Sequence, residues 1–143
     1  MKDWRNEMQV LPIGKGKKLC DGDDIAVLSI GPIGNEVIKA IEMVKEEGVS
    51  IAHYDMIYLK PLDEELLHEI GQKYNRIITV ENGVIKGGFG SAVLEFMADN
   101  GYTPHVKRIG VPDAFIEHGS IPELYQLCGM DAESIAKQLK KEN

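Results

Sequence analysis

The sequence predicts an α/β fold, a three-layer α/β/α sandwich whose sheet is mostly parallel and has about five strands. Short apolar runs alternate with longer segments of helical periodicity along the 143 residues. Strands that are separated by helices of ten or more residues pair in parallel through right-handed crossovers. Helices then cover both faces of the sheet, which gives three layers.

Four strands are predicted as buried apolar runs. Ile25–Ile30 is the clearest, because Gly31 and Pro32 end an apolar run directly. The other three runs are residues 49–54, 77–80 and 106–111. An additional strand is expected somewhere within residues 8–20.

Five helices are predicted from apolar spacing and from capping residues. Asp63 and Asp131 are good N-caps, and Gly48 is placed to end the first helix. Ser120 and Glu123 have the spacing of a capping box. The expected helices cover about residues 37–45, 64–74, 91–98, 121–127 and 132–139.

The amino-acid composition narrows the classes of function that the protein can have. The net charge of −7 disfavours a protein that binds a nucleic-acid backbone, and the basic cluster at residues 15–18 is interpreted as a solvated turn. No apolar run approaches the roughly 20 residues that cross a bilayer. The start of the chain has no apolar signal region, and two cysteines fit a reducing compartment, so a cytoplasmic protein without membrane partners is expected.

The segment Gly87-Gly88-Phe89-Gly90-Ser91 opens a helix, so its backbone amides can hold an anion or a carboxylate. It lacks the third glycine of a dinucleotide-binding fingerprint. The alternative, which we favour, is a tight turn that serves packing within the chain or between subunits. Phe89 is expected to face another domain or subunit, because an exposed aromatic side chain in such a loop gains nothing.

Glu81 and Asn82 directly follow a buried strand, at the edge where open α/β sheets bind ligands. A role for Glu81 in ordering a loop or at an interface is favoured over a role as a base. A free-standing binding module remains an alternative, with a small ligand in the crevice between Gly31 and Glu81.

No catalytic, cofactor-binding or metal-binding residue is predicted. The four histidines lack paired metal spacing, and Cys20–Asp24 is interpreted as a turn, not as a magnesium motif. His118 is the most notable histidine because it precedes a helix start, and capping and packing are expected of it. The candidates for an interface or an anion site are therefore Glu81, Asn82, Gly87, Gly88, Phe89, Gly90, Ser91 and His118.

Three segments in fixed order resemble the C-terminal domain of the transketolase-like thiamine enzymes: residues 58–63, 77–83 and 87–91. Within that group, residues 11–16 and the run Gly110-Val111-Pro112-Asp113-x-Phe115-Ile116-x-His118-Gly119 are similar to the 1-deoxy-D-xylulose-5-phosphate synthase family. The resemblance extends from about Leu11 to Leu139. The C-terminal domain of a 2-oxo-acid dehydrogenase decarboxylase β subunit is the alternative from the same superfamily.

The resemblance implies a third domain at residues 11–143, preceded by a linker remnant at residues 1–10. Intact enzymes of this family condense pyruvate with D-glyceraldehyde 3-phosphate, with loss of CO2, for non-mevalonate isoprenoid, thiamine and pyridoxal synthesis. Thiamine diphosphate and Mg2+ would bind to the other domains of the intact enzyme, and neither would bind to this domain. The implied role of this domain is to brace those domains and a homodimer, so the chain alone is expected to be inactive.

Two positions depart from the family pattern. Ile57 stands where an arginine is usual, and Asn82 stands where the second glutamate of a Val-Glu-Glu sequence is usual. Together they remove one positive and one negative charge, so a weakened polar contact is expected at this edge of the sheet.

Overall fold

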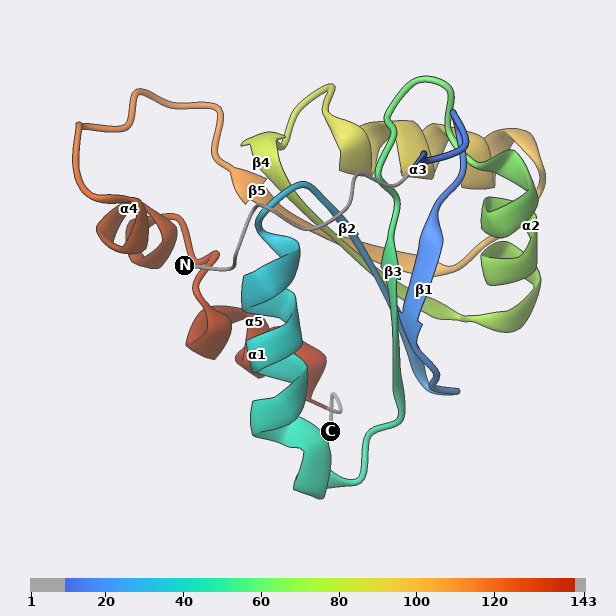
Figure 1. Cartoon of the computed structure of the whole chain (residues 1–143), viewed down its shortest axis with the longest axis horizontal. Coiled ribbons are helices and arrows are strands. Elements are labelled where there is room, and N and C mark those ends of the chain that lie inside the picture. Colours follow the sequence, from blue (N-terminus) through green and yellow to red (C-terminus); the bar gives the residue numbers. More distant parts are fainter. Residues whose placement is uncertain (1–9, 141–143) are drawn as a thin grey trace.

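A five-stranded sheet organises the structure, a computed structural model that describes residues 10–140 (Figure 1). The strand order is β1-β3-β2-β4-β5, in which β1 pairs antiparallel with β3 and all other pairs are parallel. The strands are β1 (Lys17–Cys20), β2 (Ile25–Ile30), β3 (Ile51–Asp55), β4 (Arg76–Val84) and β5 (His105–Val111). The predicted fold class is therefore confirmed.

Helices cover both faces of this sheet, as Figure 1 shows. They are α1 (Gly34–Val44), the 3-10 turn η1 (Lys45–Glu47), α2 (Glu64–Lys73), α3 (Phe89–Asp99), α4 (Ile121–Leu127) and α5 (Ala132–Leu139). One apolar core joins the sheet to α1 and α5, and a second core joins the opposite face to α2 and α3. The two cores make the three predicted layers.

The capping residues place the helices as expected. The Asp63 carboxylate accepts a hydrogen bond from the Leu66 amide at the start of α2, and Asp131 does the same for Ser134 in α5. The capping box of Ser120 is present at α4. These local signals need no tertiary contact, which is why the sequence alone reveals them.

Two expectations about element boundaries are wrong. The additional strand expected within residues 8–20 is β1, so Lys17 and Lys18 lie in an edge strand and not in a solvated turn. Lysines on an edge strand discourage pairing with another chain. Strand β4 continues to Val84, and α3 begins at Phe89 instead of near Ser91. The loop between β4 and α3 is thus shorter than expected.

The structure does not describe the segment expected to be a linker remnant, apart from Val10. Within residues 10–140, no helix is long and apolar enough to cross a membrane.

Candidate functional site

The motif segments of the sequence meet at the carboxyl edge of the parallel strands. Residues 59–62, which precede α2, and the glycine-rich segment, which opens α3, line a common hollow of about 360 Å3. Glu81 reaches the same helix start from β4. This edge is the place where open α/β sheets usually carry ligands, so it is the candidate site.

The carboxylate of Glu81 binds the N-terminus of α3. Its Oε2 accepts a hydrogen bond of 2.7 Å from the Phe89 amide, and its Oε1 accepts one of 2.9 Å from the Gly90 amide. Glu81 is only 3 % exposed. A buried carboxylate at a helix start satisfies two free amides and interacts favourably with the helix dipole. The amides proposed to hold an anion are therefore occupied by a carboxylate of the same chain, which orders the loop.

Two glycines of the segment allow this close approach. A Cβ atom at Gly88 would overlap with the Glu81 carboxylate, and one at Gly90 would lie 2.5 Å from Thr79 Oγ1. Any larger residue would push the helix start away from β4. The glycines thus serve internal packing at these positions, and Gly87 adds a left-handed turn with φ of 70°.

The expectation that Phe89 faces another domain or subunit is wrong. Phe89 is 1 % exposed and packs in the core beneath α2 and α3. The reason is that α3 begins at Phe89, so the ring belongs to the inward face of the first helical turn and not to the loop. Ser91, further along α3, is half-buried and lines the hollow of about 360 Å3.

Arg108 of β5 is a contributor that the sequence did not single out. Its Nη1 donates hydrogen bonds of 2.8 Å to the Ile85 carbonyl and to Ser91 Oγ. The Ser91 hydroxyl also accepts from the Gly87 amide. Arg108 therefore holds both ends of the loop between β4 and α3. In the sequence, Arg108 is marked only by its place at an alternate position of the strand predicted at residues 106–111. Such a position is a weak signal of a structural role.

Asn82 spans the crevice at the ends of β2 and β4. Its Oδ1 accepts a hydrogen bond of 3.1 Å from the Ile33 amide, and its Nδ2 donates one of 2.6 Å to Tyr125 Oη. The crevice between Gly31 and Glu81, proposed for a small ligand, is thus crossed by a side chain of the protein. Tyr125 was not expected to take part.

His118 lies apart from this cluster. It is exposed in the segment between β5 and α4, and Ser120 with Glu123 caps that helix. Ser120, and not His118, is therefore the cap of α4, and packing of His118 stays a prediction. Nearby, Lys86 Nζ pairs with Asp113 Oδ2 at 3.1 Å, which joins this segment to the loop after β4.

A serine and a histidine form a buried pair between β2 and β3. Ser29 Oγ and His53 Nε2 share a hydrogen bond of 2.8 Å, and both residues are 1 % exposed. Burial lowers the pKa of His53 to about 4. The types of residue suit nucleophilic catalysis, but a substrate cannot reach them, so the pair belongs to the core.

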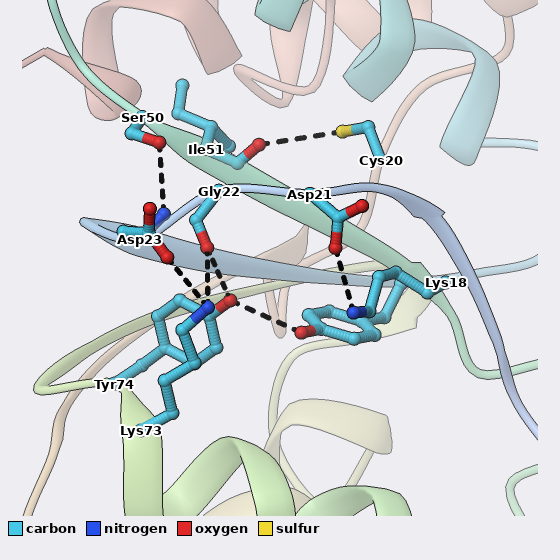
Figure 2. Close-up of polar contacts among 10 residues, drawn as sticks. Lys18, Cys20, Asp21, Gly22, Asp23, Ser50, Ile51, Lys73 and Tyr74 are labelled. Atoms are coloured by element: carbon cyan, nitrogen blue, oxygen red, sulfur yellow. Dashed lines mark hydrogen bonds and ion pairs between the residues drawn. The ribbon is translucent and has the colours of Figure 1, made fainter.

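The acidic segment Cys20–Asp24 is the bend between β1 and β2, as expected, at the opposite edge of the sheet from Glu81. Figure 2 shows Asp21 directed toward Lys18 and Asp23 toward Lys73, with N–O distances of 2.8 Å in both pairs. Both carboxylates are therefore in ion pairs with lysines. Over the described part of the chain, no group of three or more His, Cys, Asp or Glu could hold a metal ion.

Ile57 has an unusual backbone conformation. Its φ is 57°, in the left-handed region that a β-branched residue rarely adopts. Its amide donates a hydrogen bond of 3.1 Å to Asp55 Oδ1, which holds the chain in this turn after β3. Ile57, which departs from the family pattern, therefore lies where the backbone is strained, at the same carboxyl edge of the sheet.

Comparisons with known proteins agree with this architecture. Residues 14–135 match the family model described as "Transketolase, C-terminal domain". The chain is 99 % identical over 143 residues to a protein of Parabacteroides distasonis called 1-deoxy-D-xylulose-5-phosphate synthase, and 61 % identical over 141 residues to one of Bacteroides thetaiotaomicron with the same name. All or nearly all of this chain is covered, but it spans only 23 % and 22 % of those relatives.

A solved structure described as "Split gene transketolase, inactive beta4 tetramer" is similar in three dimensions. Its TM-score is 0.79 and its sequence identity is 30 %, over 92 % of this chain and 44 % of that one.

Proposed function

Since the chain belongs to the transketolase C-terminal domain family, we propose that it is the third domain of a 1-deoxy-D-xylulose-5-phosphate synthase, with residues 11–143 as the domain and residues 1–10 as part of a linker. The observation that carries the proposal is the 99 % identity to the Parabacteroides distasonis protein of that name over all 143 residues. The intact enzyme condenses pyruvate with D-glyceraldehyde 3-phosphate, releases CO2, and supplies isoprenoid, thiamine and pyridoxal synthesis in the cytoplasm.

Thiamine diphosphate, held with Mg2+, supplies the carbanion chemistry of such an enzyme. The residues of this chain do not fit that cofactor. The amides at the start of α3 are bound to Glu81, and Asn82 crosses the crevice at the ends of β2 and β4. Asp21 and Asp23 are paired with lysines. We therefore place the cofactor on the other domains and expect this domain to contribute no group to the reaction.

The domain's own role is to present a rigid sheet edge to the other domains and to a second copy in a homodimer. Rigidity at this edge comes from side chains that tie one element to the next. Glu81 fixes α3 to β4, Arg108 fixes the intervening loop to β5, and Asn82 fixes the start of α1 to α4.

The proposal is tested with the full-length Parabacteroides distasonis relative. We expect CO2 release that requires both pyruvate and D-glyceraldehyde 3-phosphate, and none from the 143-residue chain. A variant that lacks the residues matched by this chain should lose the activity. A full-length enzyme that forms no product from these two substrates would refute the proposed function.

A further inference from the structure

Helix α4 differs from the other α-helices in the described part of the chain because none of its residues is buried. The helices α1, α2, α3 and α5 each bury between two and four residues. Yet α4 carries the apolar residues Ile121, Leu124, Tyr125 and Leu127. A helix of seven residues is not stable through its own backbone hydrogen bonds, and helices in proteins depend on a packed apolar face. That packing is incomplete within residues 10–140.

The segment that leads into α4 is exposed in the same way. Figure 1 shows residues 112–120 as a loop that swings away from the sheet before α4 begins. Phe115 in this loop is 108 % exposed, and Ile121 is 65 % exposed. The ion pair of Lys86 with Asp113 lies near the start of the loop, and the capping box of Ser120 with Glu123 lies at its end. The loop is therefore anchored at both ends while its aromatic ring faces solvent.

An apolar hollow of about 260 Å3 adjoins α4. Its lining consists of Asn82, Val111, Ile116, Ile121, Leu124, Tyr125, Cys128 and Met130. We define the α4 surface as Phe115, Ile116, Ile121, Leu124 and Leu127. Phe115, Ile121 and Leu127 are each more than half exposed, and they lie next to this apolar hollow. Exposed apolar side chains gathered around a hollow are typical of a protein–protein contact.

We propose that the α4 surface is where the preceding part of the same enzyme polypeptide packs against this domain. The inference rests on the proposed function and names the contact through which the domain braces the enzyme. The occupant follows from length, because this chain spans only 23 % of its Parabacteroides distasonis relative and more than three quarters of that polypeptide lies outside it.

The charges around the α4 surface indicate which residues are expected on the surface that packs against it. Asp113, Glu117 and Glu123 border it, and Glu117 is exposed. The part of the polypeptide that packs here should offer an apolar pocket for Phe115, with a lysine or arginine beside it for Glu117. The contact is then apolar at its centre and charged at its rim, as interfaces in proteins usually are.

Hydrogen exchange tests the contact in the enzyme as it exists. The backbone amides within residues 112–121, of which Pro112 has none, are compared between the 143-residue chain and the full-length Parabacteroides distasonis relative. We expect these amides to exchange at least tenfold more slowly in the full-length enzyme. Residues 34–44 are the matched control, since α1 also exposes apolar side chains, Ile38 at 50 % and Met43 at 54 %, and should change less than twofold. Equal exchange of residues 112–121 in both proteins would overturn the inference.

A benzophenone side chain at position 115 of the full-length enzyme identifies the occupant. Cross-links to peptides that precede the matched region are the expected result, with few or none from the same probe at position 38. Cross-links confined to the matched region of a second copy would overturn the inference, and so would equal yields from the two positions. The unaltered full-length enzyme is assayed for product in parallel. An active enzyme without the cross-link refutes the contact alone, whereas an inactive enzyme with the cross-link refutes the proposed activity alone.

Discussion

Replacement of Glu81 should destabilise the domain more than replacement of any exposed glutamate. Glu81 is 3 % exposed, and its carboxylate accepts two amide hydrogen bonds at the start of α3. Hydrogen bonds to charged groups contribute about 1.5–3 kcal/mol each, but two bonds to one side chain are not independent. We therefore expect Glu81→Ala to lower the free energy of unfolding by about 3 kcal/mol, because two buried amides lose their partner.

Urea unfolding of the 143-residue chain, followed by circular dichroism, measures this loss. The isosteric change Glu81→Gln should cost less, about 2 kcal/mol, because its carbonyl oxygen can still accept from one amide. Glu95→Gln, in an exposed position of the same helix, is the control and should change stability by less than about 0.5 kcal/mol. If Glu81→Ala were as stable as the control variant, the account of how α3 is held to β4 would be refuted.

Three further results are expected from the same assay. Phe89→Ala should lower the free energy of unfolding by about 3–5 kcal/mol, as for other core aromatic residues. A loss below about 1 kcal/mol would contradict the core position of Phe89 and favour an interface role. His53 binds a proton in the unfolded chain near pH 6.5 but in the folded chain only near pH 4, so stability should fall by up to about 3 kcal/mol as the pH drops through this window. His53→Asn should flatten that pH dependence, and an unchanged slope would contradict the assignment. Ile57→Asn should raise stability by up to about 1 kcal/mol, because asparagine tolerates a φ of 57° better; a loss would show that the strain is absent.

Features that depend on neighbouring residues were predictable from the sequence. The caps at Asp63 and Asp131 and the box of Ser120 with Glu123 all join groups three residues apart. The buried strands are likewise visible as short apolar runs. Parallel pairing then follows from the intervening helices, so the fold class depends little on contacts between distant residues.

Features that depend on distant contacts were predicted less well. The start of α3 is set by Glu81, eight residues upstream on a strand, and no local capping rule describes such a partner. The error at Phe89 follows directly, because a ring placed in a loop and a ring placed in the first helical turn face different surroundings. The contacts of Asn82 with Ile33 and Tyr125, 49 and 43 residues away, were equally inaccessible without the tertiary structure.

The proposed role of this domain is to brace its enzyme without holding any part of the cofactor site. Isothermal titration of the 143-residue chain with thiamine diphosphate and Mg2+ measures whether the domain binds the cofactor. The α3 amides are bound to Glu81, and the crevice at the ends of β2 and β4 is crossed by Asn82, so we expect no heat of binding. Binding with micromolar affinity, at one cofactor per chain, would contradict the account.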